Sequence, residues 1–274
     1  MALPKPYDQY VLTGKSRAAW HTSFVIPQLN LLLDAGLCVN KLRPKHVFLT
    51  HGHNDHTLLA PAFVKREDPP DIYCPAEVRT VFDQFILSNS ILNLGGLVGP
   101  HESPGGQGAV SDGAGQEPAS SPPRDPSQSP SVAHKLKPEY TSLPGQQLKA
   151  LRESGVEITA PQSTPFLAFM GDTTAETLAA EPEWLREGIP VVITECSFLY
   201  PEHRSQAVKT KHTLWSDLEK VIRKWPKTTF VLMHFSLRYK DKDVRRFFKE
   251  MIDPPTNIVI WVDGEDQPDG FDDD

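Results

Sequence analysis

One stretch decides the fold of this chain: Val47-Phe48-Leu49-Thr50-His51-Gly52-His53-Asn54-Asp55-His56-Thr57. Its first three residues form a short apolar run, which is typical of a buried β-strand. The run stops in a segment where three of the ten histidines and one aspartate fall within six positions. Imidazoles and carboxylates are the usual protein ligands of zinc and related metals. A single histidine here could be an ordinary polar group at a strand end, but the set of four predicts a metal site.

The spacing within this cluster indicates two metal positions. At the end of an extended strand, His51 and His53 point to the same side, whereas a turn at Asn54 brings Asp55 and His56 to a second position. Two metal ions about 3.5–4 Å apart, sharing a bridging oxygen, are a standard device for hydrolysing phosphate esters. The sequence therefore predicts a two-metal hydrolytic centre.

Length and composition restrict the class of protein. With 274 residues the chain is long enough to bury a substantial core. Its net charge of −7 and isoelectric point near 5.8 argue against non-specific coating of nucleic acid, although a local basic patch is compatible with both values. The three cysteines, Cys38, Cys74 and Cys196, have no paired metal spacing and suggest no disulfide framework.

Neither a membrane segment nor an export signal is predicted. The sequence has no run of about 18 apolar residues, and residues 1–6 have no signal-peptide core. Since the cysteine usage also fits a reducing compartment, we expect a soluble intracellular protein, in the cytoplasm or the nucleus.

Three later strands are expected to end, like the first, in a polar residue of ligand type. The strands are predicted at residues 165–170, 190–194 and 229–233, and the polar residues that follow or end them are Asp172, Glu195 and His234. Taken alone, Asp172 is as well explained as a turn residue and His234 as a capped core histidine. Beside the histidine cluster we assign both as ligands, because each metal needs about three or more protein donors.

The remaining pattern predicts a mixed α/β chain. A hairpin turn is expected at Pro27-Gln28, and Asp34 follows the second strand of that hairpin. Helices are predicted at residues 58–64, 76–94, 143–154, 214–225 and 244–251, and further strands at 71–74 and 258–262.

The composition changes between residues 99 and 133. This stretch is rich in glycine, proline and serine and contains no aromatic residue, so it cannot bury enough apolar surface to offset its ordering entropy. We interpret it as a disordered insertion, because apparent parts of one fold lie on both sides. The prediction is one domain at residues 1–262, interrupted by residues 99–133 and followed by an acidic tail at 263–274.

The motifs resemble those of the metallo-β-lactamase superfamily, whose signature is His-x-His-x-Asp-His after an apolar strand. Later motifs resemble one branch, the tRNA 3′-processing endoribonucleases called ribonuclease Z. These motifs are Gly171-Asp172-Thr173, the pair Glu195 and His212, and His234-Phe235-Ser236-Leu237-Arg238-Tyr239. The segment 135–159 is similar to the short, plant-type members. The resemblance covers about residues 15 to 262, apart from the insertion.

The resemblance implies the fold and the site. The fold is a four-layer αββα sandwich of the α/β (α+β) class, a single domain in which two mixed sheets pack face to face with helices outside. Two zinc ions are implied, with manganese as the alternative, and the metal ligands are His51, His53, Asp55, His56, Asp172 and His234. Asp172 bridges the two ions, Asp55 also serves as general base, and Asp34 supports the histidine loop by hydrogen bonds. His212, held by Glu195, assists the leaving group.

The implied substrate is precursor tRNA, whose 3′ trailer is removed by hydrolysis of a phosphodiester downstream of the acceptor stem. No membrane is involved, and a homodimer is compatible with the family. A phosphate-tracking surface could be formed by Lys209, Lys211, Arg238, Lys240, Lys242, Arg245 and Arg246. A solvated basic helix face explains the last four equally well.

The sequence departs from the family at one point. The family carries a further zinc-ligating histidine on a strand and loop before the position of Lys135, where this chain has the insertion. The nearest histidines are His101 and His134, and His134 adjoins the segment where similarity resumes. The family's docking arm is also not recognisable. A weakened or inactive member and a sequence that lacks a segment are both compatible with this departure.

Two other functional classes stay open. A small-molecule hydrolase of the same superfamily would use the same metals in a closed pocket, and a non-catalytic descendant would bind RNA or another partner without turnover. A serine hydrolase is disfavoured because the sequence has no Gly-x-Ser-x-Gly elbow.

Overall fold

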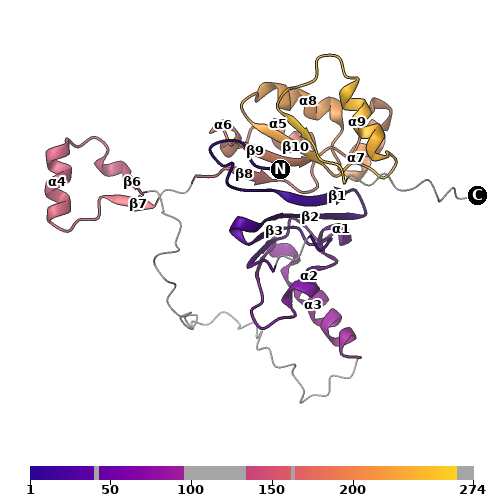
Figure 1. Ribbon diagram of the computed structural model, residues 1–274, viewed down its shortest axis with the longest axis horizontal. Helices are drawn as coiled ribbons and strands as arrows, with labels where there is room; N and C mark the ends of the chain where they lie inside the picture. The colour runs from indigo at the N-terminus through magenta and orange to yellow at the C-terminus, as the bar shows by residue number, and fades with distance from the viewer. Residues whose placement is uncertain (40–42, 96–133, 162–163, 264–274) are drawn as a thin grey trace, which may run out of the picture. The chain divides into compact units, whose positions relative to one another are not determined.

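The computed structural model describes residues 1–39, 43–95, 134–161 and 164–263. The chain forms two compact units (Figure 1), one built from Met1–Gly106 with Phe166–Asp274 and the other from Gln107–Pro165. In both units, no helix among the described residues is long and apolar enough to cross a membrane.

The first sheet of the first unit has five strands, which neighbour one another in chain order. They are β1 (Thr13–Arg17), β2 (His21–Ile26), β3 (Leu31–Leu33), β4 (His46–Phe48) and β5 (Asp71–Tyr73). The first three strands run antiparallel, and β3, β4 and β5 run parallel. The predicted turn at Pro27-Gln28 is confirmed, as the short 3₁₀ turn Pro27–Leu29 joins β2 to β3.

The second sheet is entirely parallel, in the order β11-β10-β9-β8. Its strands are β8 (Leu167–Phe169), β9 (Val191–Glu195), β10 (Thr229–Met233) and β11 (Ile258–Ile260). Parallel strands need crossover connections, usually helices. Here these are α5 (Ala175–Ala179), α6 (Glu183–Arg186), α7 (Arg204–Thr210), α8 (Trp215–Lys224) and α9 (Asp241–Lys249).

The two sheets pack face to face through side chains that alternate along each strand. The inner layer consists of Phe24, Ile26, Leu33, Val191, Ile193, Val231 and Met233. The intervening residues Val192 and Leu232 point the other way, into the core that α8 and α9 cover. Helices α1 (Asn54–Thr57), α2 (Ala60–Val64) and α3 (Arg79–Asn93) follow β4 and β5 in the chain. Of these, α2 and α3 cover the outer face of the first sheet through Ala60 and Phe82.

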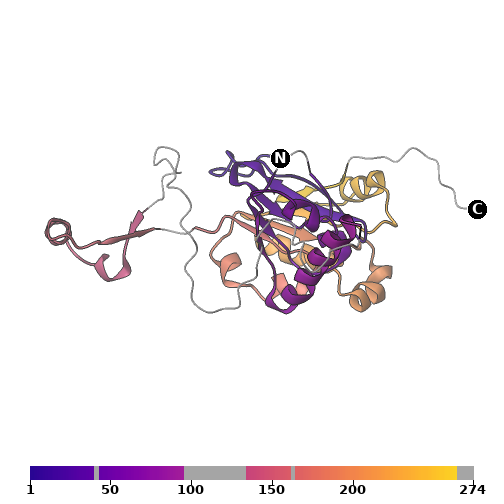
Figure 2. The same cartoon turned by 90° about the horizontal axis from the view of Figure 1, so that it is seen from below.

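The predicted αββα sandwich is therefore confirmed. Figure 1 shows α5, α8 and α9 on one side of the paired sheets and α2 and α3 on the other. In the view from below, α2 and α3 lie in front of the sheets (Figure 2). The helix expected at residues 58–64 is found at Ala60–Val64, and a further short helix, Asn54–Thr57, precedes it. The histidine cluster thus runs directly from a strand end into a helical turn.

The second unit contains a small antiparallel sheet of β6 (His134–Leu136) and β7 (Thr159–Pro161). Between these strands lie the 3₁₀ turn Pro138–Tyr140 and helix α4 (Gly145–Glu153). The chain leaves α4 through Gly155 at φ +81°, a left-handed conformation that glycine adopts readily at the end of a helix. The predicted disorder of residues 99–133 and most of the predicted acidic tail lie outside the described residues, and the proposed domain boundaries stay a prediction.

The packing of the two sheets makes Phe24 a sensitive position. Phe24 is fully buried, and its ring centroid lies 6.0 Å from that of Phe169 and 5.3 Å from that of Trp261. We expect Phe24→Ala to lower the free energy of unfolding by about 3–5 kcal/mol, because it leaves a cavity between the sheets. Denaturant unfolding measures this. Val208→Ala is the control, since that side chain is 71% exposed; equal effects of the two variants would contradict this description of the core.

Candidate metal centre

The residues that the sequence assigned to a metal site come together at the carboxyl ends of strands from both sheets. His51 and His53 follow β4, and Asp55 and His56 lie in α1. From the second sheet, Asp172 follows β8, Glu195 ends β9 and His234 follows β10. His212 lies between α7 and α8. The predicted convergence of strand ends is thus confirmed by the geometry described below.

Asp172 lies at the middle of the group. Its Oδ2 atom is 3.4 Å from Nε2 of His51 and 3.5 Å from Nδ1 of His53. Its Oδ1 atom is 3.1 Å from Nε2 of His56 and 3.2 Å from Nε2 of His234. One carboxylate thus faces both halves of the histidine cluster, which is the position that a bridging ligand requires. His53 lies at the rim, with 67% of its side chain exposed.

Asp55 faces the second half of the group. Its Oδ2 atom is 3.2 Å from Nε2 of His234 and 3.6 Å from Nε2 of His56. The same oxygen accepts a hydrogen bond of 3.0 Å from the backbone N–H of Ala19. Ala19 lies in the turn between β1 and β2 at φ +61°, so the first hairpin reaches the centre and fixes this carboxylate.

The buried carboxylate of Asp34 orients two of the imidazoles. Because a carboxylate only accepts, Nδ1 of His56 must donate to Asp34 Oδ2, at 2.6 Å. Thr50 donates to the same carboxylate through its N–H at 2.8 Å and its hydroxyl at 2.9 Å. Since that hydroxyl proton is used, Nδ1 of His51 must donate to Thr50 Oγ1, at 3.0 Å. Both rings thus carry a proton on Nδ1 and turn Nε2 toward Asp172, and the predicted hydrogen bonds from the histidine loop to Asp34 are confirmed.

Glu195 is the buried carboxylate of the second sheet, as Asp34 is of the first, and it too accepts hydrogen bonds from the loops around the centre. It is fully buried, and Oε1 accepts from Nδ1 of His212 at 2.8 Å and from the N–H of Thr173 at 2.7 Å. Oε2 accepts from the hydroxyl of Ser197 at 2.5 Å and from the N–H of Thr213 at 3.1 Å. The predicted Glu195–His212 pair therefore forms, and it is tied through Thr173 to the loop that carries Asp172.

The carboxylates and imidazoles shift one another's pKa values. Burial would raise the pKa of Asp172 and of Asp55, but the neighbouring imidazoles outweigh burial and lower both. Burial likewise would lower the pKa of His56, yet Asp172 and Asp34 raise it to about 10. The pKa of His212 is raised as well, because Glu195 outweighs the effect of burial. Without a cation, the centre thus holds ionised carboxylates and a protonated His56.

The residues present fit a divalent transition metal. Three sets of side chains bring their ligand atoms within 4.8 Å of one another: His51, His56 and Asp172; Asp55, His56 and His234; and Asp172, His212 and His234. Nε2 of His51 and Oδ1 of Asp172 are buried, and neither makes a hydrogen bond within the described residues. Buried polar atoms without partners are rare. Imidazole and carboxylate donors without partners are what a zinc or manganese ion would satisfy.

A glycine allows the Asp172 loop to approach the histidine loop. Gly171 has φ +60°, and a Cβ atom there would lie 2.5 Å from Oγ1 of Thr50. That hydroxyl is the one that orients His51, so any side chain at position 171 would push against the support of a candidate ligand.

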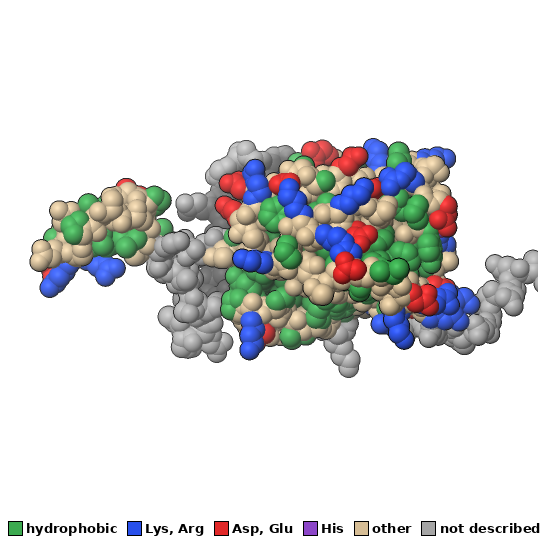
Figure 3. Space-filling model, turned by 90° about the horizontal axis from the view of Figure 1, so that it is seen from above, with side chains coloured by type: hydrophobic (Ala, Val, Ile, Leu, Met, Phe, Trp, Pro, Cys, Tyr) green, Lys and Arg blue, Asp and Glu red, His purple; other side chains and the backbone are tan. Residues whose placement is uncertain are grey.

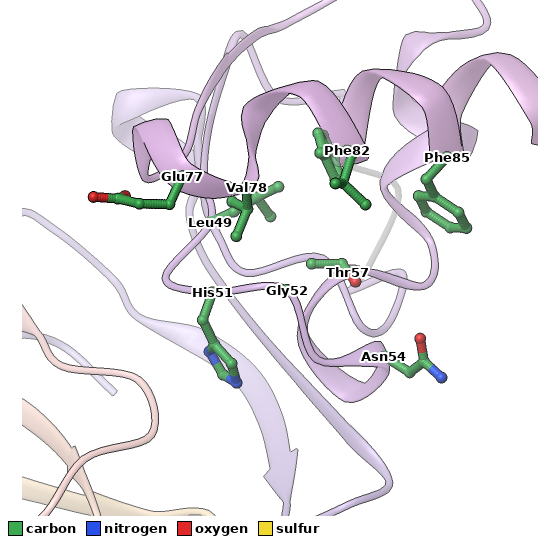
Figure 4. A pocket seen from close by; sticks show the side chains of 10 residues that line it. Leu49, His51, Gly52, Asn54, Thr57, Glu77, Val78, Phe82 and Phe85 are labelled. Atoms are coloured by element: carbon green, nitrogen blue, oxygen red, sulfur yellow. The ribbon is translucent and has the colours of Figure 1, made fainter.

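An apolar cavity lies on the α3 side of the histidine loop. It has a volume of about 400 Å³, and Val78, Phe82 and Phe85 form much of its wall. His51, a candidate ligand, also lines this cavity, and Figure 4 shows its ring pointing away from α3.

The question of a further histidine ligand is not settled by the described residues. His101 lies outside them. His134 begins β6 in the second unit, and its assignment as a ligand stays a prediction.

The sequence interpretation missed the groups that orient the ligands. These are the hydroxyls of Thr50 and Ser197 and the backbone N–H groups of Ala19 and Thr173. The hydroxyls left one signal: each stands within two residues of a predicted site residue at a strand end, Thr50 before His51 and Ser197 after Glu195. The backbone donors left none, because any residue supplies an N–H.

Comparisons with known proteins show what this chain is similar to. The family described as the Metallo-beta-lactamase superfamily matches residues 32–148. In Arabidopsis thaliana, tRNase Z TRZ2, chloroplastic, is 28% identical over 263 residues, covering 87% of this chain and 71% of the relative. The protein tRNase Z TRZ1 of the same species is 28% identical over 254 residues, covering 86% of this chain and 89% of the relative. The structure of human tRNase Z, short form, aligns with a TM-score of 0.49 at 14% identity, covering 92% and 96% of the two chains.

The hydrogen bonds of Asp34 predict how its loss would act. We expect Asp34→Asn to weaken zinc binding by about 10–100-fold, because His56 and Thr50 lose the charged acceptor that orients them. Competition with a fluorescent chelator measures the affinity. Asp217→Asn is the control, because Asp217 lies on α8 and its carboxylate pairs with Arg204 of α7 rather than with a candidate ligand. If both variants bind zinc as tightly as the natural chain, the orienting role of Asp34 is wrong.

Proposed function

The chain belongs to the metallo-β-lactamase superfamily and is distantly homologous, at 28% identity, to plant tRNase Z proteins over most of its length, and on this premise we propose that it removes the 3′ trailer from precursor tRNA. The coarser activity is that of a metal-dependent hydrolase of the superfamily. The specific proposal adds the substrate and the bond cleaved, a phosphodiester just downstream of the acceptor stem.

One observation favours RNA cleavage over a small-molecule hydrolase or a non-catalytic protein. The imidazole of His212, hydrogen-bonded to a carboxylate, lies beside the candidate metal ligands. Nδ1 of His212 donates to the buried Glu195, and His212 belongs to a ligand group with Asp172 and His234. Hydrolysis of an RNA phosphodiester must expel an alkoxide, which is a poor leaving group unless it is protonated. An imidazole with a raised pKa next to the reacting phosphate suits that task.

The site residues divide the reaction between them. Bound metal ions would polarise the phosphate and allow water to ionise near neutral pH. Asp55, held by the N–H of Ala19, takes a proton from the attacking water. The water oxygen bonds to phosphorus, and the bond from phosphorus to the 3′-oxygen breaks. His212 gives its proton to that oxygen while Glu195 keeps the ring in place. The products are tRNA with a 3′-hydroxyl and a trailer with a 5′-phosphate.

We assign the ligands of the two ions as the sequence resemblance implies. The first ion takes His51, His53 and Asp172, and the second takes Asp55, His56, Asp172 and His234. The distances of Asp172 from all four imidazoles support a bridging role for its carboxylate.

Exposed cations near His212 offer a surface for the RNA backbone. Lys209 and Lys211 precede His212, and the guanidinium of Arg238 stacks on the ring of Phe198 at 5.1 Å. On α9, Arg246 pairs with Asp243 at 2.6 Å, which favours a solvated helix face there. On the face seen from above, basic and acidic side chains are interspersed (Figure 3). We therefore place the phosphate contacts at Lys209, Lys211 and Arg238.

A homodimer, which the resemblance allows, is testable by sedimentation.

The proposal predicts release of the trailer from a precursor tRNA incubated with the protein and zinc or manganese. We expect His212→Ala to lower the rate by about 10²–10⁴-fold, the usual value of a general acid, and Asp55→Ala to lower it further. Gel analysis of end-labelled RNA measures both. Lys220→Ala, a 77% exposed position on α8, should cleave normally. Cleavage of small esters alone would favour a small-molecule hydrolase, and tRNA binding without cleavage would favour a non-catalytic descendant.

The metal content is a separate prediction. After dialysis against zinc and then metal-free buffer, elemental analysis should find close to two ions per chain. His53→Ala should lower this number, because His53 is assigned to the first ion. A content near zero, or one unchanged by His53→Ala, would contradict the assignment.

A further inference from the structure

The hydroxyl of Ser197 lies between the two halves of the centre. Its Oγ atom is 3.2 Å from Nδ1 of His234 and 2.5 Å from Oε2 of Glu195. It also lies 2.9 Å from the backbone oxygen of His234. Ser197 is 1% exposed, and His234 and Glu195 are equally enclosed. Water is thus excluded from these contacts, and each must be satisfied within the protein.

The single proton of this hydroxyl decides the direction of the hydrogen bonds. It can go to the carboxylate of Glu195 or to the carbonyl of His234, and the shorter, charge-assisted bond to Glu195 is the stronger. The lone pairs of Ser197 then accept from Nδ1 of His234. Nδ1 of His234 therefore carries a proton, and Nε2 faces the carboxylates of Asp55 and Asp172, each 3.2 Å away. When a cation is bound, the Nε2 lone pair would be directed at it.

The same carboxylate orients a second imidazole. The other oxygen of Glu195 accepts from Nδ1 of His212 at 2.8 Å, so His212 also directs its Nε2 outward. The buried carboxylate of Glu195 therefore orients two imidazole rings, that of His212 by a direct hydrogen bond and that of His234 through Ser197. Asp34 orients two other imidazoles in the same way. It accepts a hydrogen bond from His56 directly and is linked to His51 through the hydroxyl of Thr50.

We propose that Ser197 is a positioning residue that fixes the ring tautomer of His234 and joins this candidate metal ligand, through Glu195, to the proposed acid His212. The part that concerns His212 rests on the proposed function. The part that concerns His234 does not, because it predicts a property of the protein in the absence of RNA.

The first test reads the tautomer in the metal-free protein. Long-range ¹H–¹⁵N spectra of histidine-labelled protein at pH 8 distinguish a proton on Nδ1 from one on Nε2. We expect Nδ1 of His234 to be protonated in the natural chain, because Ser197 accepts from it. Ser197→Ala should give a mixture of both tautomers or a proton on Nε2, where Asp55 and Asp172 would accept it. A ring that keeps the Nδ1 proton in Ser197→Ala would overturn the proposal.

The second test reads metal affinity. Ser197→Ala should weaken zinc binding at least tenfold in competition with a fluorescent chelator, since loss of such a supporting bond usually costs 10–100-fold. Ser197→Thr keeps the hydroxyl and should bind zinc within about threefold of the natural chain. If Ser197→Ala does not fold, Ser197→Cys, which keeps the size and replaces the hydroxyl by a weak donor, takes its place in both tests.

A matched control exists in β9, the strand that precedes Ser197. Thr194 in β9 is fully buried, and its hydroxyl makes no hydrogen bond within the described residues. Thr194→Val removes this hydroxyl at nearly constant volume and should leave the tautomer and the zinc affinity unchanged. Equal zinc affinities for Thr194→Val and Ser197→Ala would overturn the proposal.

Cleavage of precursor tRNA separates this proposal from the proposed function. At saturating zinc, Ser197→Ala should lower kcat at least several-fold with little change in KM, because RNA contacts are kept while His212 and His234 lose their common support. If the natural chain cleaves no RNA but the tautomer and affinity tests succeed, the function is wrong and the role of Ser197 toward His234 stands. If the chain cleaves RNA and Ser197→Ala cleaves it equally well, the link to His212 is wrong.

Discussion

The need to satisfy two buried carboxylates governs the arrangement of this protein. Asp34 and Glu195 are both fully buried, and an ionised carboxylate without partners in such a place would cost several kcal/mol. Each is therefore surrounded by donors. Asp34 takes those of Thr50 and His56, and Glu195 takes those of Thr173, Ser197, His212 and Thr213. Because these donors lie in the loops that carry the candidate ligands, satisfying the two carboxylates also builds the metal centre.

The β-sandwich gives each carboxylate its position. Asp34 follows β3 in the first sheet and Glu195 ends β9 in the second, and the apolar layer that includes Phe24 and Val231 holds the two sheets together. Asp34 and His234 both leave their strands with positive φ, at +55° and +61°. Such turns are uncommon for residues other than glycine. They direct the chain sharply at the strand end, so that a short side chain reaches the centre from a rigid support.

Much of this was predictable from the sequence, because the signals were local. The histidine cluster after Val47–Leu49 and the polar residues after three apolar runs identified the strand ends and the ligand types. The turn at Asn54 was predicted, but its helical form was not; Asp55 and His56 within it make hydrogen bonds to distant residues, which the local sequence does not reveal. The hydroxyls of Thr50 and Ser197 were missed for a different reason. Serine and threonine are common at strand ends, and only their distance from a carboxylate and an imidazole gives them a role.

The division of groups between the sheets has a chemical consequence. The first sheet supplies His51, His53, Asp55 and His56, and the second supplies Asp172 and His234 together with Glu195. Two of the three possible ligand groups combine side chains from both sheets, namely His51, His56 and Asp172, and Asp55, His56 and His234. The third, Asp172, His212 and His234, comes from the second sheet and its connections. Because Glu195 orients His212 and, through Ser197, His234, the proposed acid and a candidate ligand share one rigid support. The hydrogen bonds of Glu195 and Ser197 thus link the proposed proton donor to a candidate ligand through one buried carboxylate.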